Sequence, residues 1–188
     1  MLFSDDVISS LQLGKLAVIP TDTLYGIVCS ARDKEAVEKL YHLRGRDAAK
    51  PCIILIADIS GLKEFGIVLS EADEKTLHKV WPGKVSVVFD CLGDEWVHLH
   101  RGGTKTLAFR VPDDEGLRNL LHNTGPLSAP SANLEGQPPA HTTAEAKNSF
   151  GDQVALYVDG GHRESLPSTV ARLHDGVWKV LRQGEIIL

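Results

Sequence analysis

The chain has 188 residues, of which 43% are hydrophobic and 24% are charged, and these values are typical of one globular domain over residues 1–188. No apolar run approaches the roughly 20 residues of a membrane span, and the N-terminus MLFSDDVISSLQLGK lacks the basic start and apolar core of a signal peptide. The formal net charge of −5 argues against a protein that coats nucleic acid with its whole surface, although a local basic groove is compatible with it.

Apolar runs bounded by turn residues predict eight strands. In chain order they cover residues 15–20, 51–57, 84–90, 106–112, 125–132, 154–160, 168–173 and 178–184. Helical patterns lie between several of them, over residues 33–44, 70–81, 113–123 and 142–150. Asp33, Ser70 and Thr142 stand at helix starts as N-caps. Early strands alternate with helices, and the last three strands follow one another closely. This mixture predicts an α/β domain with a twisted mixed sheet and flanking helices.

The three cysteines, Cys29, Cys52 and Cys91, lie inside apolar stretches without CxxC spacing. Scattered thiols of this kind are typical of small core residues in a reducing compartment. We therefore expect a cytoplasmic protein with no membrane segment.

Basic side chains fall where elements end, which is where side chains from different elements can converge. Arg44, Arg46 and Lys50 surround Gly45, and three like charges that repel each other have little use on an exposed loop. Arg110 ends the run TLAFR, and Arg182 lies in VLRQG. The planar fork of arginine matches carboxylate and phosphate oxygens two at a time. This pattern favours an anion site over scattered surface charges.

Small polar residues follow two of the predicted strands. Ser128, Ser131 and Asn133 precede a Gly- and Pro-rich segment, and Ser168 and Thr169 open the strand STVARL. Such residues leave room for a ligand and offer donors, although an ordinary turn would have a similar composition. No GxxxxGK[ST], GxGxxG or GxSxG motif occurs, and the pair His98 and His100 lacks a third ligand in zinc spacing. The residues alone predict a cavity rich in Arg, Lys, Ser, Thr and Asn for a phosphate-bearing, amino-acid-like ligand.

Taken in order, these segments resemble the YrdC-type (TsaC) family of threonylcarbamoyl-AMP synthases. The resemblance runs from Leu16 to Gly184 and rests on PTDTLYGI, LYHLRGRDAAKP, WPGKVSVVF, LAFRVPD, SAPSANLEGQP, PSTV and LRQG. It implies a twisted sheet with a large electropositive cavity. It also implies synthesis of threonylcarbamoyl-AMP and pyrophosphate from L-threonine, bicarbonate and ATP, with Mg²⁺ carried on ATP. Separate transferase proteins would then pass the threonylcarbamoyl group to an adenosine of tRNA.

The resemblance also implies roles for individual residues. Arg46 and Lys50 would be catalytic and hold the ATP phosphates, with Arg44 beside them. Thr23, Arg110 and Ser168 would bind threonine or its carbamate. The remaining ATP-binding residues would be Thr106, Ser131, Asn133 and Arg182. No protein ligand to a metal is expected. Asp22 is either a base for the ammonium proton or a capping or solvated side chain.

Three positions depart from the family pattern: Arg44 replaces a lysine, Lys84 a proline and Ser86 a threonine. None of these changes removes a phosphate ligand. Two alternative functions stay open from the sequence. One is a double-stranded RNA-binding or ribosome-assembly protein, and the other is a paralogue that acts on another carbamate.

Overall fold

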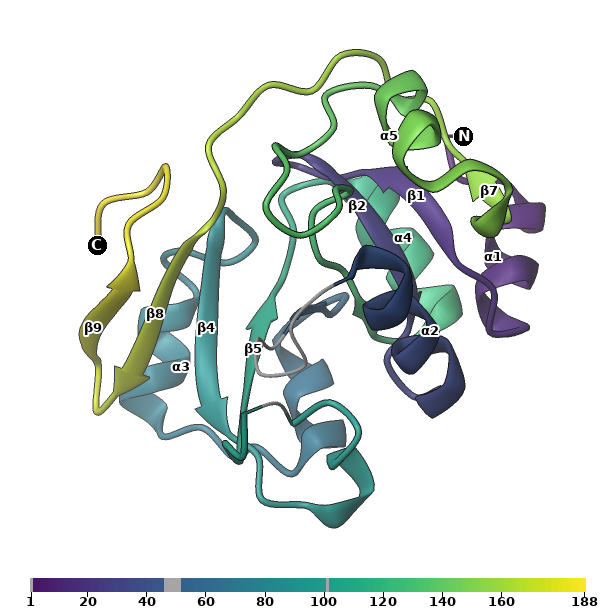
Figure 1. Ribbon diagram of the computed structural model, residues 1–188. Helices are drawn as coiled ribbons and strands as arrows, with labels where there is room; N and C mark the ends of the chain where they lie inside the picture. The colour runs from purple at the N-terminus through teal and green to yellow at the C-terminus, as the bar shows by residue number, and fades with distance from the viewer. Residues whose placement is uncertain (1, 46–51, 101) are drawn as a thin grey trace.

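The structure is a computed structural model that describes residues 2–45, 52–100 and 102–188 (Figure 1). Arg46 and Lys50 lie outside the described residues. Within them, the strands form one mixed sheet in the order β7-β1-β2-β6-β3-β5-β4-β8-β9. The strands are β1 (Ala17–Pro20), β2 (Tyr25–Ser30), β3 (Ile53–Leu55), β4 (Val85–Asp90), β5 (Thr106–Arg110), β6 (Leu127–Ser128), β7 (Leu156–Tyr157), β8 (Thr169–His174) and β9 (Val177–Arg182). The expected twisted mixed sheet with flanking helices is confirmed.

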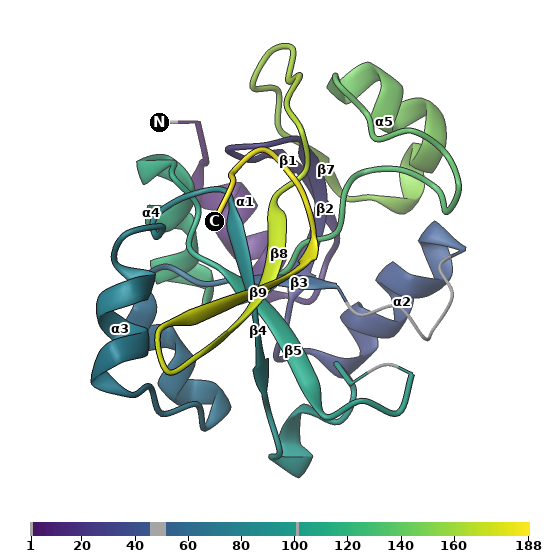
Figure 2. The ribbon, with the colours of Figure 1, turned by 90° about the vertical axis from the view of Figure 1, so that its left-hand side faces the viewer.

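Helices lie on both sides of the sheet (Figure 2). They are α1 (Asp5–Gln12), α2 (Lys34–Arg44), α3 (Glu71–Leu77), α4 (Glu115–Thr124) and α5 (Thr143–Phe150), with the short 3₁₀ helices η1 (Ile59–Phe65), η2 (Asp94–Trp96) and η3 (Gly151–Gln153). No helix within the described residues is long and apolar enough to cross a membrane.

The predicted N-caps are confirmed by their hydrogen bonds. The Asp33 side chain accepts from the Ala36 N–H at 3.0 Å, and Ser70 Oγ accepts from the Asp73 N–H at 3.1 Å. Thr142 does the same at the start of α5, at 3.2 Å. Each cap satisfies one of the N–H groups that a helix start leaves without a partner.

The sequence analysis missed one α-helix, one strand and the three short 3₁₀ helices, and α3 is shorter than predicted. The missed α-helix is α1, and the missed strand is β2, which pairs with β1 as an antiparallel hairpin. Residues 78–80 form a turn in place of the predicted last helical turn, and Trp81, the residue before Pro82, is disfavoured in helical conformation. The indole of Trp81 instead donates to the Val85 carbonyl at 2.6 Å.

Two hydrophobic clusters hold the layers together. One cluster packs α1 and α4 against β1 and β2, with Leu11, Ile19 and Leu121 among its buried members. The larger cluster joins α2 and α5 to β2 and continues to η1 and α3 under β4 and β5. There the ring of Phe65 meets that of Phe109 edge-on, with centroids 4.7 Å apart. The three cysteines are buried free thiols of the larger cluster, as predicted.

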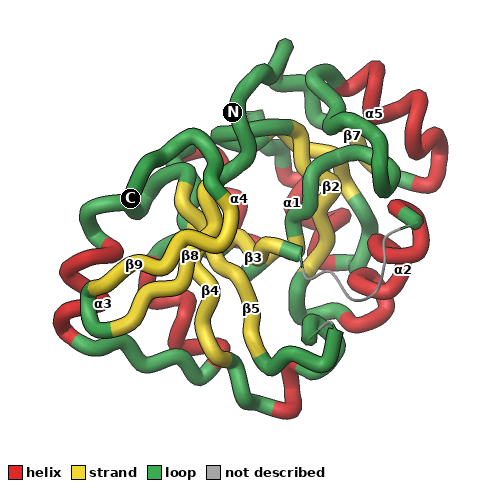
Figure 3. The backbone as a smooth tube through the Cα atoms, turned by 60° about the vertical axis from the view of Figure 1, so that its left-hand side comes forward, coloured by secondary structure: helices red, strands yellow, loops and turns green. Residues whose placement is uncertain are grey.

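The connection between β7 and β8 crosses from one edge of the sheet toward the other. It comprises residues 158–168, which we call the strap. Since β7 is the first strand in the order and β8 the last but one, the strap must bridge the two halves of the sheet. Figures 1 and 3 show it arching from the α5 side to the start of β8.

Candidate active site

A cavity of about 440 Å³ lies where the β1–β2 turn, the strap and the open face of β4, β5, β8 and β9 meet. Six of the ten residues that the sequence analysis assigned to the site line it: Thr23, Thr106, Arg110, Ser131, Ser168 and Arg182. They come from five separate segments, so the fold brings these distant residues to one place. The lining shows the predicted mixture of hydroxyl and guanidinium groups.

The cavity floor is ordered by the strand register. Ser86, Val170 and Arg182 form one row across β4, β8 and β9. Arg110 lies on the same face of β5, two residues beyond Ala108, which pairs with Val88 in the next row. Alternate residues share a face of a strand, so the opposite residues of these strands join the hydrophobic core while this set faces the cavity.

The β1–β2 turn presents a buried ion pair at one end of the cavity. Asp22 Oδ1 accepts from Arg110 Nη1, and Asp22 Oδ2 accepts from the Asp113 N–H at 3.0 Å. The side chains of Asp22 and Arg110 are only 3% and 5% exposed. One of the two alternatives given above for Asp22 was a capping or solvated side chain. The structure instead shows a buried side chain that is paired with Arg110.

This burial has consequences for the guanidinium of Arg110. Desolvation lowers the pKa of Arg110, and the charge of Asp22 opposes that change. Nε of Arg110 is buried and has no hydrogen-bond partner within the described residues. A buried donor without a partner is costly, so this N–H group would be stabilised by an acceptor placed within its reach.

The turn itself is fixed by its two threonines. Thr21 Oγ1 donates to the Leu24 carbonyl at 2.7 Å and lies 3.0 Å from Thr23 Oγ1. The hydroxyl of Thr23 is thereby held in one place at the cavity wall rather than rotating freely.

The opposite wall is formed by the end of the strap and by β9. Ser168 Oγ lies 2.8 Å from Ser86 Oγ, and both side chains are buried. Arg182 Nη2 donates to the Ser168 carbonyl at 2.8 Å. A β-bulge sets the direction of this arginine. Ala171 pairs with Val180 but Val170 pairs with Arg182, so Leu181 is the extra residue. In a regular register Leu181 would oppose Val170, and Arg182 would point to the other face of the sheet.

The segment from Pro130 to Asn133 is clamped between β2 and the end of α2. The Ile27 N–H donates to the Pro130 carbonyl at 3.0 Å, and Ser131 Oγ donates to Asn133 Oδ1 at 2.6 Å. Arg44 is 1% exposed, and its Nε donates to the Asn133 carbonyl at 2.9 Å. Arg44 and Asn133 thus lie behind the cavity wall and support Ser131, rather than lining the cavity themselves.

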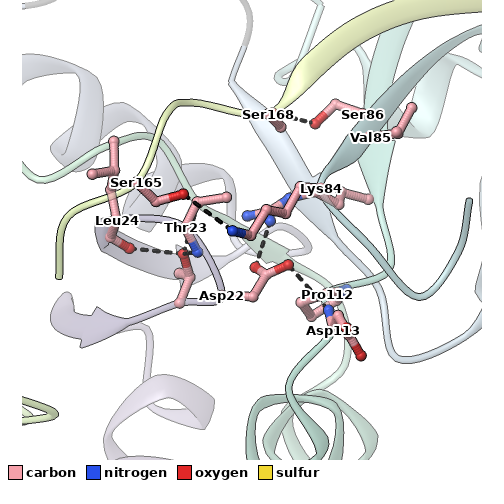
Figure 4. Close-up of polar contacts among 12 residues, drawn as sticks. Asp22, Thr23, Leu24, Lys84, Val85, Ser86, Pro112, Asp113, Ser165 and Ser168 are labelled. Carbon is pink, nitrogen blue, oxygen red and sulfur yellow. Dashed lines mark hydrogen bonds and ion pairs between the residues drawn. The ribbon is translucent and has the colours of Figure 1, made fainter. Parts of the chain in front are cut away.

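The strap is tied down on both sides of the cavity. Near β2, the Tyr25 hydroxyl donates to the Gly161 carbonyl at 2.8 Å. Near β4, Lys84 Nζ donates to Ser165 Oγ at 3.2 Å and to Glu185 Oε1 at 2.8 Å. Figure 4 shows Lys84 reaching from the turn before β4 to Ser165, beside Asp22. Lys84 therefore joins the strap to the C-terminal segment.

Some residues of the site escaped the sequence analysis. Arg172 lines the cavity, yet in the sequence it is one basic residue inside a strand pattern. Alternation with the buried Ala171 and Leu173 was the available signal, since it places Arg172 on the opposite face from the core. The partnership of Lys84 with Glu185 spans 101 positions and has no local signal.

A second, larger cavity of about 660 Å³ lies between η1, α3 and α4, with Leu62, Ile67 and Trp81 in its lining. Its two histidines each face a carboxylate: His78 lies 4.0 Å from Glu74, and His122 lies 4.0 Å from Asp58. None of the sequence-predicted site residues lines this cavity. The smaller cavity is therefore the candidate site.

Comparison with known proteins adds three observations. A family model described as "Sua5_yciO_yrdC: Telomere recombination" matches residues 9–184. The chain is 32% identical over 178 residues to "Threonylcarbamoyl-AMP synthase" of Bacillus subtilis, covering 94% of this chain and 51% of that protein. It is also 32% identical over 183 residues to the Photobacterium profundum protein of the same name, covering 95% of this chain and 97% of that protein.

The fold is shared with a solved structure, "Crystal structure of P. abyssi Sua5 complexed with L-threonine". The TM-score is 0.87 at 30% sequence identity, and the match covers 95% of this chain and 53% of that chain. The present chain thus spans about half the length of the Bacillus and P. abyssi proteins, and nearly all of the Photobacterium protein.

Proposed function

The chain belongs to the Sua5/YciO/YrdC family, and from that premise we propose that it is a threonylcarbamoyl-AMP synthase. The substrates would be L-threonine, bicarbonate and ATP, and the products threonylcarbamoyl-AMP and pyrophosphate. One observation carries the proposal: a single cavity gathers Thr23, Arg110, Ser168 and Arg182 from distant parts of a chain of this family. Basic and hydroxyl groups facing one cavity suit reactants that are all anions or zwitterions.

The chemistry has two steps. The threonine amine adds to CO₂ derived from bicarbonate, which forms a carbamate and releases a proton. A carbamate oxygen then attacks the α-phosphorus of ATP, the bond to the β-phosphate oxygen breaks, and pyrophosphate leaves. Positioning and stabilisation of negative charge supply most of the catalysis in transfers of this kind. These are the two tasks that the cavity residues would perform.

The amino-acid end of the reaction fits the Asp22–Arg110 end of the cavity. The threonine carboxylate would accept the buried Nε–H of Arg110, which has no other acceptor within the described residues. Asp22 would fix the guanidinium, because it holds Nη1 and is itself held by the Asp113 N–H. Thr23 and Ser168, on the two walls, would contact the threonine or its carbamate.

The nucleotide would occupy the rest of the cavity, along Thr106, Ser131 and Arg182, with Arg46 and Lys50 on its phosphates. Arg44 would act through Asn133, since its guanidinium is bound to that residue. Mg²⁺ would enter with ATP. The carboxylate of Asp22 is engaged by Arg110, so the cavity suits a metal held mainly by phosphate oxygens. The product would be used by tRNA-modifying transferase proteins in the cytoplasm.

The test is an omission assay with the purified chain. ATP, L-threonine and bicarbonate are supplied together and then left out one at a time, and pyrophosphate is measured. The proposal requires that release depends on all three. Release with ATP alone, or with another amine replacing threonine at equal rate, would contradict it. Tight binding of duplex RNA with a steep salt dependence and no pyrophosphate release would favour the RNA-binding alternative.

A further inference from the structure

Arg172 is a basic residue of the cavity floor, and no role has been assigned to it. It lies in the middle of β8 and lines the cavity. Its Nη1 donates to Asp90 Oδ1 at 3.1 Å, and no other hydrogen bond of this guanidinium is found within the described part of the chain. The side chains of Arg172 and Asp90 are 41% and 68% exposed. Within the described residues, Arg172 therefore has further donors available, and the carboxylate that it contacts is largely exposed.

The register places Arg172 on the cavity floor, one row away from Arg182. Arg172 pairs with Val88 on one side and Lys179 on the other, whereas Arg182 pairs with Val170. Rows separated by two residues are about 7 Å apart along the strands. Asp90 lies a further row along, opposite Thr106, on the same face. The cavity floor therefore extends from the end that holds Arg110 to a second basic group, Arg172.

Three cations share the cavity-side face of the β8–β9 hairpin. They are Arg172, Lys179 and Arg182, and Asp90 is the acid that contacts one of them. The whole chain has a net charge of −5, so such a cluster is not a consequence of general composition. Arg172 and Lys179 lie directly opposite each other, and like charges in that position are destabilising. A bound polyanion would offset this repulsion.

We propose that Arg172 binds the phosphates of the nucleotide beyond the α-phosphate, and that Asp90 holds the guanidinium in the absence of nucleotide. This assignment rests on the proposed function. The α-phosphorus must lie near the carbamate, at the Arg110 end. A group one row further along the floor is then placed for the β- and γ-phosphates, which leave as pyrophosphate. Exchange of partner is favourable because an exposed carboxylate pair is weak and a phosphate accepts from arginine in a bidentate manner.

Two substitutions of the same ion pair separate this role from a structural one. Arg172→Gln removes the phosphate donor, whereas Asp90→Asn removes the competing carboxylate and the negative charge. If the pair only stabilises the sheet, both substitutions should change ATP affinity in the same direction. If Arg172 exchanges Asp90 for phosphate, ATP affinity should fall in Arg172→Gln and rise in Asp90→Asn. Arg32→Gln is the matched control, because Arg32 is an exposed arginine paired with Glu64 and is not part of the cavity lining.

The measurement is calorimetric binding of ATP, AMP and pyrophosphate to the intact chain at fixed ionic strength with Mg²⁺, after thermal melting has shown that each variant is folded. We expect Arg172→Gln to weaken the binding of ATP and of pyrophosphate about tenfold or more, as for loss of a charged hydrogen bond. The binding of AMP should weaken by less than about twofold. Asp90→Asn should strengthen ATP about threefold, and Arg172→Lys should recover part of the loss.

Three results would overturn the assignment while leaving the proposed function intact: unchanged ATP affinity in Arg172→Gln, an equal loss for AMP and ATP, or weaker ATP binding in Asp90→Asn. Failure of the wild-type chain to bind ATP at all would instead reject the proposed function. The two failures are therefore distinguishable in one set of titrations.

Discussion

Asp22→Asn is expected to destabilise the whole fold, because it leaves the charge of Arg110 buried without a counter-charge. The two side chains are 3% and 5% exposed, so water replaces the missing carboxylate poorly. The asparagine keeps the size of the side chain, and one of its atoms can still accept from the Asp113 N–H. The change therefore isolates the charge from the packing.

The magnitude follows from the burial of the pair. Removing one partner of a buried ion pair costs about 3–5 kcal/mol, and we take about 3 kcal/mol here because one hydrogen bond of Asp22 survives. A domain of this size loses about 2–4 °C in melting temperature per kcal/mol, so Tm should fall by about 6–12 °C. The exposed pair Arg32–Glu64, with side chains 54% and 31% exposed, is the control. Arg32→Gln should cost less than about 1 kcal/mol.

Urea unfolding at pH 7 measures these free energies, with Arg110→Gln and the double variant Asp22→Asn/Arg110→Gln completing a cycle. We expect the double variant to be about as stable as either single variant, because the second change removes a group that the first has already stranded. A loss below about 1 kcal/mol in Asp22→Asn, or additive losses in the double variant, would refute the reasoning.

Three further predictions concern the strap, the glycine next to it, and Arg46 with Lys50. The pKa of Glu185 is lowered from its ordinary value of 4.5 by hydrogen bonds from Lys84 and Ser165. The stability that this carboxylate gives to the strap is therefore present above pH 4.5 and is lost as the pH falls below that value. Hydrogen exchange of strap amides, corrected for intrinsic rates, should therefore rise at low pH in the wild type and be raised already at pH 7 in Lys84→Met. A Cβ on Gly184 would lie 2.2 Å from a strap carbonyl oxygen; Gly184→Ala should cost about 1–3 kcal/mol in urea unfolding, and an unchanged midpoint would contradict that contact. Arg46→Ala and Lys50→Ala should each lower pyrophosphate release about 10²-fold; wild-type rates would refute their assignment to the site.

The elements that could be predicted were those with a local signal. The helices after Asp33, Ser70 and Thr142 were found with their caps, because a cap and an apolar face are both visible within a few residues. The strand β2 was missed because its apolar run directly follows the polar turn and contains Gly26, which weakens a strand pattern. Its partners, β1 and β6, supply the hydrogen bonds that make it a strand.

The family, the α/β class and six of the residues that line the cavity could be predicted from the sequence, because these follow from short motifs and from the ends of strand patterns. Which side chains meet in space depends on the tertiary structure. Asp22 and Arg110 are 88 positions apart, and the one-residue bulge at Leu181 turns Arg182 toward the cavity. Pairing partners and register depend on the energy of the whole sheet, where a shift of one residue moves a side chain to the opposite face. No local pattern in a single sequence carries that information.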